Sequence, residues 1–107
     1  MDENLKKIKE IILQTAKEMN IEIDRIILFG SRARGDYRED SDYDLLIVTK
    51  EKLDKEKELE FLAKATNKFL EENFDVDIII VSFDYYLKYK DVYGDISGIA
   101  TKEGILL

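Results

Sequence analysis

The stretch "FGSRARGDYREDSDYDLLIV", residues 29–48, joins a Gly-Ser turn to two acidic residues that lead directly into an apolar segment. One residue separates Asp42 from Asp44, and side chains alternate between the two faces of a strand. Both carboxylates are therefore predicted to leave the same face at the start of a buried strand. Two unpaired aspartates beside an apolar strand are costly unless a cation lies between them.

Helices are predicted on both sides of this stretch. Apolar residues at spacings of three and four indicate amphipathic helices at residues 4–19 and 51–73. Residues 83–107 are expected to form one or two short helices, broken near Gly94 and Gly98. This tail also carries four tyrosines that are more typical of packing or of a partner surface than of chemistry: Tyr85, Tyr86, Tyr89 and Tyr93.

Three strands are predicted, at residues 23–30, 42–49 and 75–82, from runs rich in β-branched residues. Between the first two lies a polar segment, 31–40, that begins with a serine suited to capping a short helical turn. The runs "DLLIV" and "DIIIV" lack polar alternation, so helices are expected to cover both faces of the sheet. The element order predicts a small α/β (α+β) fold, a mixed β-sheet with flanking helices.

Length and composition bound the class of protein. The 107 residues are enough for one domain, residues 1–107, and the 45% hydrophobic and 38% charged residues are typical of a folded globular chain. Neither an apolar run of about 18 residues nor the apolar core of a signal peptide is present. The expected location is therefore the cytoplasm, with no membrane partner.

The absence of two residue types narrows the chemistry. Without histidine or cysteine, a metal ion must be held by oxygen, which favours Mg²⁺ or Mn²⁺. A general base must then be a carboxylate, a lysine, a tyrosine or water. The net charge of −7 argues against stable nucleic-acid binding by this chain alone, because cationic side chains supply most of that affinity. The same charge also simply favours solubility.

A third carboxylate is expected near the first two. Asp77 opens the apolar part of the third strand and joins Asp42 and Asp44 if that strand lies beside the second. Asp75 is an alternative, because alternation places it on the same face as Asp77. Two metal ions about 3.5 to 4 Å apart would align an attacking oxygen with a leaving group. Taken alone, an Asp-x-Asp pair is more often a turn or a helix cap.

The Gly-Ser turn is suited to phosphate. Gly30 allows a ligand to approach the backbone closely, and Ser31 offers a hydroxyl and backbone N–H groups. Arg32, Arg34 and Arg38 add positive charge that matches phosphate oxygens. Arg34 and Arg38 have an alternative role in surface ion pairs with the neighbouring acidic residues Asp36, Glu39 and Asp40.

The combination of the Gly-Ser turn, the Asp-Tyr-Asp strand start and a later strand aspartate resembles the nucleotidyltransferase superfamily typified by DNA polymerase β. The similarity covers residues 23–82 well and the termini loosely. It implies the polymerase β palm-like fold and transfer of a nucleoside monophosphate from a triphosphate, usually ATP, to an acceptor hydroxyl. Pyrophosphate would leave.

The resemblance also implies roles for individual residues. Asp42 and Asp44 would hold both metal ions, and Asp77 would hold the catalytic one and help to deprotonate the acceptor. Gly30 and Ser31 would grip the triphosphate. The family pattern gives no role to the arginines, so nucleotide binding by Arg32 and Arg34 is predicted from charge alone.

The short chain resembles in particular the minimal nucleotidyltransferase (MNT) branch, whose members are antitoxins of HEPN-domain toxins. This resemblance implies transfer of AMP to a tyrosine hydroxyl of a partner HEPN toxin, which silences it. Two alternatives stay open: a non-catalytic antitoxin that neutralises the toxin by binding, and a transferase that acts on a small molecule such as an aminoglycoside. The latter class generally has a second domain for its acceptor. A homo- or hetero-oligomer is possible in each case.

Overall fold

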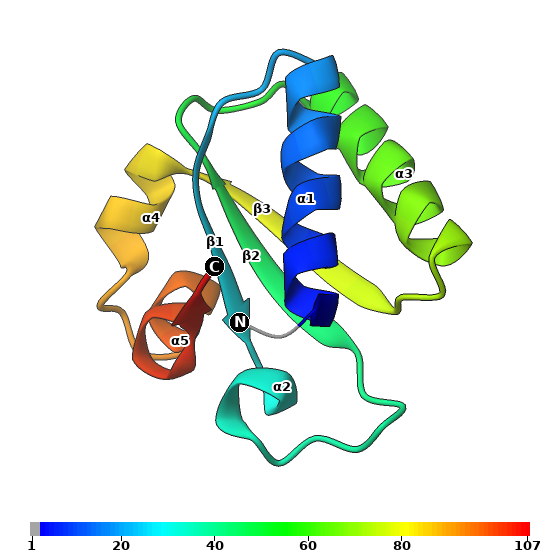
Figure 1. Ribbon diagram of the computed structural model, residues 1–107. Coiled ribbons are helices and arrows are strands. Elements are labelled where there is room, and N and C mark those ends of the chain that lie inside the picture. Colours follow the sequence, from blue (N-terminus) through cyan, green and yellow to red (C-terminus); the bar gives the residue numbers. More distant parts are fainter. Residues whose placement is uncertain (1–2) are drawn as a thin grey trace.

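One four-stranded mixed sheet organises the chain in the computed structural model, which describes residues 3–107 (Figure 1). The strands are β1 (Ile23–Phe29), β2 (Tyr43–Thr49), β3 (Val76–Ser82) and β4 (Ile105–Leu106). Their order in the sheet is β3-β2-β1-β4. β1 is antiparallel to β2 and β4, whereas β2 and β3 are parallel. The predicted mixed sheet is therefore confirmed, and each of the three predicted strands is one residue shorter than expected.

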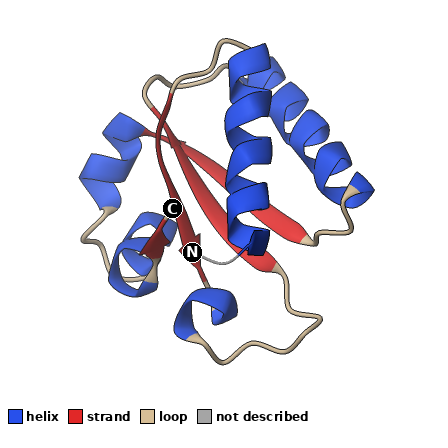
Figure 2. Cartoon of the chain, in the orientation of Figure 1, coloured by secondary structure: helices blue, strands red, loops and turns tan. Residues whose placement is uncertain are grey.

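Most of the helices form two layers, one on each face of the sheet, and the short helix at residues 31–34 lies outside them (Figure 2). They are α1 (Glu3–Glu18), α2 (Ser31–Arg34), α3 (Lys55–Glu71), α4 (Phe83–Tyr89) and α5 (Ile96–Glu103). Alternation along β2 sends Leu45 and Ile47 into a core with α1 and α3, and Leu46 and Val48 into a smaller core with α4 and α5. A fully buried strand of this kind explains the uninterrupted apolar run of β2.

The two long helices follow the predicted periodicity. α1 matches the expected helix at residues 4–19, whereas α3 begins at Lys55, four residues later than expected. The Asp54 side chain accepts a hydrogen bond of 2.8 Å from the Lys57 N–H and so caps the helix there. Within residues 3–107, no helix combines the length and the hydrophobicity needed to span a bilayer.

The prediction that helices cover both faces of the sheet is wrong for β3. Ile78 and Ile80 pack toward α1 and α3, but Asp77 and Ile79, on the opposite face, are exposed. β3 is an edge strand, and α4 follows it without a loop, so the second helical layer covers only its far end. The apolar run of β3 therefore includes an uncovered strip that begins at Asp77.

The tail forms two helices, as expected, but only one of its two predicted breaks is correct. The chain is broken near Gly94, which has a φ of 88°. Gly98 lies inside α5, where a Cβ atom would come within 2.1 Å of the Val92 carbonyl oxygen. This glycine is therefore required by the close approach of the preceding loop and does not end a helix.

Gly98→Ala is expected to lower the free energy of unfolding by about 1 to 3 kcal/mol, because the added methyl group meets backbone atoms that cannot rotate away. Urea unfolding followed by circular dichroism measures the change. Ile99→Ala, at a partly exposed position of the same helix, is the control and should cost less. Equal stability of Gly98→Ala and the parent protein would contradict the proposed close approach.

Candidate active site

The register of the sheet pairs Asp44 with one residue on each neighbouring strand. Asp44 is opposite Phe29, the last residue of β1, and opposite Asp77 on β3. Paired residues of parallel strands share a face, so the Asp44 and Asp77 carboxylates lie on the face that α4 and α5 cover incompletely. Tyr43 points to the other face and is buried.

The remaining two aspartates lie just before their strands. Asp42 precedes β2 and Asp75 precedes β3, and together with Asp77 they border a cavity of about 220 Å³. The Asp75 carbonyl oxygen accepts a hydrogen bond of 2.9 Å from the Tyr43 N–H, which ties the two strand starts together. Asp77 is the residue directly opposite Asp44, and Asp75 lies two residues before Asp77.

The absence of a side chain at Gly30 leaves room for the Asp44 carboxylate beside the turn. The Gly30 backbone has a φ of 74° and a ψ of −159°, a region that is essentially restricted to glycine. A Cβ atom at this position would lie 2.2 Å from Oδ2 of Asp44. The carboxylate therefore packs directly against the turn backbone.

Electrostatics set Asp44 apart from an ordinary surface aspartate. Its pKa is raised, first by burial and then by the negative charges of Asp77 and Asp42, while Arg34 acts in the opposite direction. A bound cation would relieve this repulsion, and carboxylate oxygens are suitable ligands for Mg²⁺ or Mn²⁺. Across residues 3–107, however, no three acidic, histidine or cysteine side chains are already arranged to hold a metal ion. The donor chemistry fits a hard divalent cation, although the ligands are not preassembled.

Arg32 organises the loop between α2 and β2. Its guanidinium group donates hydrogen bonds of 3.0 to 3.2 Å to the carbonyl oxygens of Ser41 and Glu39. It also lies 4.3 Å from the ring centroid of Tyr37 and 4.4 Å from that of Tyr43. These contacts hold the loop that leads into Asp42, and the predicted nucleotide contact of Arg32 stays a prediction.

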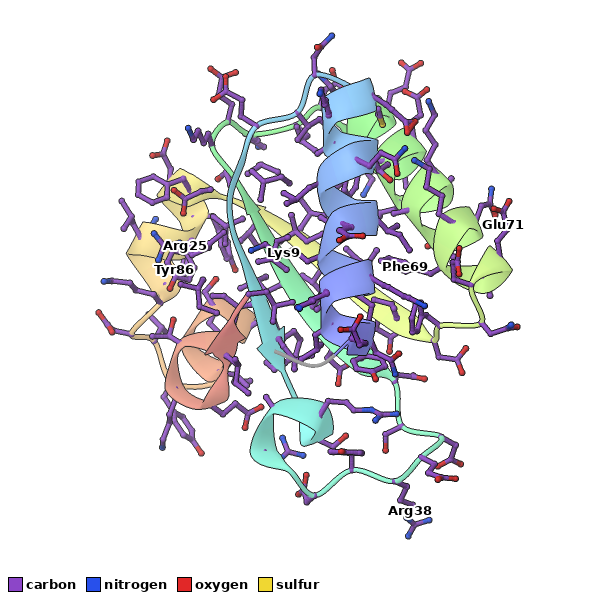
Figure 3. The ribbon with its side chains drawn as sticks, in the orientation of Figure 1. Lys9, Arg25, Arg38, Phe69, Glu71 and Tyr86 are labelled. Carbon is purple, nitrogen blue, oxygen red and sulfur yellow. The ribbon has the colours of Figure 1, made fainter. Side chains whose placement is uncertain are left out.

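The turn itself differs from the expected geometry. The residue before α2 is Gly30, no side chain in the described structure caps this helix, and Ser31 is its first residue. The predicted capping role of the serine is therefore wrong, because the chain enters α2 through the glycine. The Ser31 side chain is partly exposed beside the turn. Arg38, in contrast, is exposed and points away from the sheet (Figure 3).

Arg34 contacts a residue that sequence reasoning missed. The guanidinium group pairs with Asp36 at 3.4 Å, which realises one of the surface pairs considered above, and with Glu103 at 3.2 Å. Oε1 of Glu103 also accepts a hydrogen bond of 3.1 Å from the Gly30 N–H. These contacts raise the pKa of Arg34. No local pattern could have identified Glu103, since it lies 69 residues after Arg34 in the sequence.

A mixed sheet whose strand aspartates face each other behind a Gly-Ser turn is the arrangement of a nucleotidyltransferase domain. The sequence profile of the family described as "Polymerase beta, Nucleotidyltransferase" matches residues 6–90. The chain belongs to this family, and the resemblance to it is confirmed.

Two curated relatives come from Methanocaldococcus jannaschii and are named as candidate protein adenylyltransferases. The chain is 51% identical over 49 residues to MJ0141, which covers 42% of this chain and 50% of the relative. It is 54% identical over 43 residues to MJ0604, which covers 40% of this chain and 43% of the relative. These matches thus span half or less of each relative.

Solved structures share the fold over most of the chain. A candidate nucleotidyltransferase is 27% identical with a TM-score of 0.63 and covers 99% of both chains. Another, from Sulfolobus solfataricus, is 24% identical with a TM-score of 0.61 over 94% of this chain and 76% of that one. A toxin-antitoxin structure with AMP-PNP is 20% identical with a TM-score of 0.60 over 91% and 69% of the two chains. The fold of the domain is therefore that of nucleotidyltransferases.

Gly30→Ala is expected to destabilise the domain more than Gly35→Ala. Both glycines have positive φ angles, but a Cβ atom at Gly35 would have no neighbour within 4 Å, whereas at Gly30 it would meet the Asp44 carboxylate. The Gly35 variant should lose about 1 kcal/mol from backbone strain alone, and the Gly30 variant about 2 to 4 kcal/mol. In an Asp44→Ala background the penalty at Gly30 should shrink. Purely additive unfolding energies in this cycle would contradict the contact.

Asp44→Asn is expected to stabilise the metal-free protein at neutral pH. Because the pKa of Asp44 is raised in the fold, its contribution to stability is present below the unfolded pKa, about 4, and is lost as pH rises through the folded pKa. The advantage of the variant in thermal unfolding should therefore grow from about pH 4 to pH 7 in buffer with a chelator. Asp91→Asn, at an exposed position, is the charge-matched control. An advantage that does not depend on pH would contradict this account.

Proposed function

We propose that this domain transfers AMP from ATP to a hydroxyl group of a partner protein, with pyrophosphate as the leaving group. The observation that carries the proposal is the pairing of Asp44 with Asp77 across β2 and β3, directly beside the Gly30 turn. Membership of the nucleotidyltransferase family supports the reaction class. The names of the two curated relatives support a protein as the acceptor.

The residues divide into two groups in this proposal. Asp42, Asp44 and Asp77 would hold two Mg²⁺ or Mn²⁺ ions, which would neutralise phosphate charge and fix the direction of attack. Gly30 and Ser31 contact the triphosphate through the turn backbone and the serine hydroxyl. Arg34 supplies positive charge to the triphosphate. Arg32 supplies positive charge less directly and holds the adjoining loop.

The reaction is an in-line displacement at the α-phosphorus of ATP. The acceptor oxygen forms a bond to this phosphorus, and the bond from the phosphorus to the bridging oxygen of pyrophosphate breaks. The acceptor proton passes to the Asp77 carboxylate or to water, since the chain has no histidine or cysteine to take it. Positioning and charge neutralisation, rather than covalent catalysis, supply the rate enhancement.

The acceptor in this proposal is a tyrosine of a HEPN-domain toxin, and the domain acts as the antitoxin in the cytoplasm. The resemblance to the MNT branch supports this acceptor, and the toxin-antitoxin structure with AMP-PNP shares the fold. The uncovered strip of β3, with Asp77 and Ile79 exposed, leaves space for a protein beside the carboxylates.

Labelled ATP with Mg²⁺ should label the cognate HEPN protein in the presence of this domain, at a tyrosine identified by mass spectrometry. The Asp42→Asn/Asp44→Asn variant should lose at least about 100-fold in rate, because it removes charged ligands without removing volume. Asp91→Asn should transfer AMP normally. Transfer that proceeds unchanged in the double variant would refute the proposed roles of these carboxylates.

A second candidate function is neutralisation of the toxin by binding alone, which the exposed strip of β3 at Asp77 and Ile79 would allow without transfer. The two functions differ in their dependence on the carboxylates. A folded variant with asparagine at positions 42, 44 and 77 should fail to protect cells from the toxin if transfer is required. Full protection by this variant would establish neutralisation by binding.

A further inference from the structure

One carboxylate of the chain holds two groups that the proposed function assigns to the triphosphate. Oε1 of Glu103 accepts a hydrogen bond from the Gly30 N–H at 3.1 Å. Nη1 of Arg34 lies 3.2 Å from Oε1 and 3.3 Å from Oε2 of the same residue. α5 and α2 meet at this contact near the end of β1 (Figure 1). An anion supplied by the protein itself therefore lies on the Gly-Ser turn.

The backbone of Glu103 is firmly anchored. The next residue, Gly104, donates a hydrogen bond of 2.8 Å to the Ala100 carbonyl oxygen. A Cβ atom at Gly104 would come within 2.2 Å of that oxygen and 2.4 Å of Cγ2 of Ile27, so the chain passes tightly between α5 and β1. β4 then pairs with β1. Glu103 can leave the turn only by rotation of its side chain.

Space for that rotation lies next to the carboxylate. Glu103 lines a cavity of about 690 Å³ on the side of the α4–α5 loop, and its other charged lining residues are Lys90, Asp91 and Lys102. The two lysines outnumber Asp91, so a displaced carboxylate would meet a net positive charge there. The cavity therefore offers the Glu103 side chain space away from the turn.

We propose that Glu103 is a specificity-determining internal anion, which a nucleotide must displace from Gly30 and Arg34 before its phosphates can bind. This inference rests on the proposed function, because it assumes that phosphates use the same donors. A carboxylate oxygen and a phosphate oxygen are both anionic acceptors, and one N–H group cannot donate fully to both. Ligands with several phosphate oxygens can replace the carboxylate, whereas a ligand without phosphate cannot.

Calorimetric titration of the full chain with Mg²⁺–AMP-PNP and with inorganic tripolyphosphate tests the competition. Glu103→Ala should bind both ligands about tenfold more tightly than the parent protein, since a charge-assisted contact no longer has to be broken. Glu103→Asp keeps the charge but is one methylene shorter, so it should resemble the alanine variant. Adenosine, which lacks phosphate, should bind equally to all of these proteins.

Glu71→Gln is the charge-matched control, because Glu71 is exposed on α3, at the far side of the domain from α5 (Figure 3). It should bind the ligands like the parent protein. An equal gain in affinity for Glu71→Gln would overturn the inference, since net charge would then explain the effect. Weaker binding by Glu103→Ala would also overturn it, because Glu103 would then shape the turn for the ligand.

The Gly30 amide proton gives a second readout that does not require transfer. Its NMR resonance should move upfield in Glu103→Ala and return downfield when tripolyphosphate is added. An amide that responds to neither change overturns the inference. Tighter binding by Glu103→Ala without any AMP transfer to protein would refute the proposed function alone, whereas normal transfer with unchanged affinities would refute the inference alone.

Discussion

The register of β2 between its two neighbours is the constraint on which the site depends. It places Asp44 opposite the end of β1 and opposite Asp77. A slip of one residue would exchange the two faces of the strand, so that Asp44 would enter the core beside α1 and α3. Burial of Leu45 and Ile47 on that face makes such a slip costly, and the edge-on contact of Tyr43 with Phe74 supports the register at its first residue.

This arrangement stores electrostatic repulsion that the rest of the domain must balance. Asp44 lies near Asp77 and Asp42, and its pKa is raised first by burial and then by the negative charges of these two carboxylates. The two-sided core around β2 fixes the backbone despite this repulsion. Gly30 removes the steric conflict, and Arg34 supplies part of the opposing charge. The repulsion that weakens the metal-free fold is also what would make a divalent cation bind well.

The C-terminal segment serves both the core and the site. Tyr86 packs in the smaller core, where the Arg25 guanidinium group lies 4.8 Å from its ring centroid. Figure 3 labels these two neighbouring side chains. Packing is thus confirmed for one of the four tail tyrosines, whereas Tyr93 is 96% exposed and is available to a partner. The same segment carries Glu103 to the Gly-Ser turn. Glu103 is the last residue of α5. Anchoring of α5 to β1 therefore couples the stability of the smaller core to the geometry of the candidate nucleotide site.

Local physics explains what the sequence by itself determined. Helical periodicity, apolar strand runs and the alternation that places Asp42 and Asp44 on one face depend on residues only a few positions apart. The need for glycine at position 30 comes in part from the contact with Asp44 on the neighbouring strand. Pairing between distant segments decided the rest. Parallel pairing of β2 and β3 selected Asp77 over Asp75 as the partner of Asp44, and the edge position of β3 left its first residues uncovered. Glu103 reached Gly30 because β4 pairs with β1, a contact between segments with no local pattern in common.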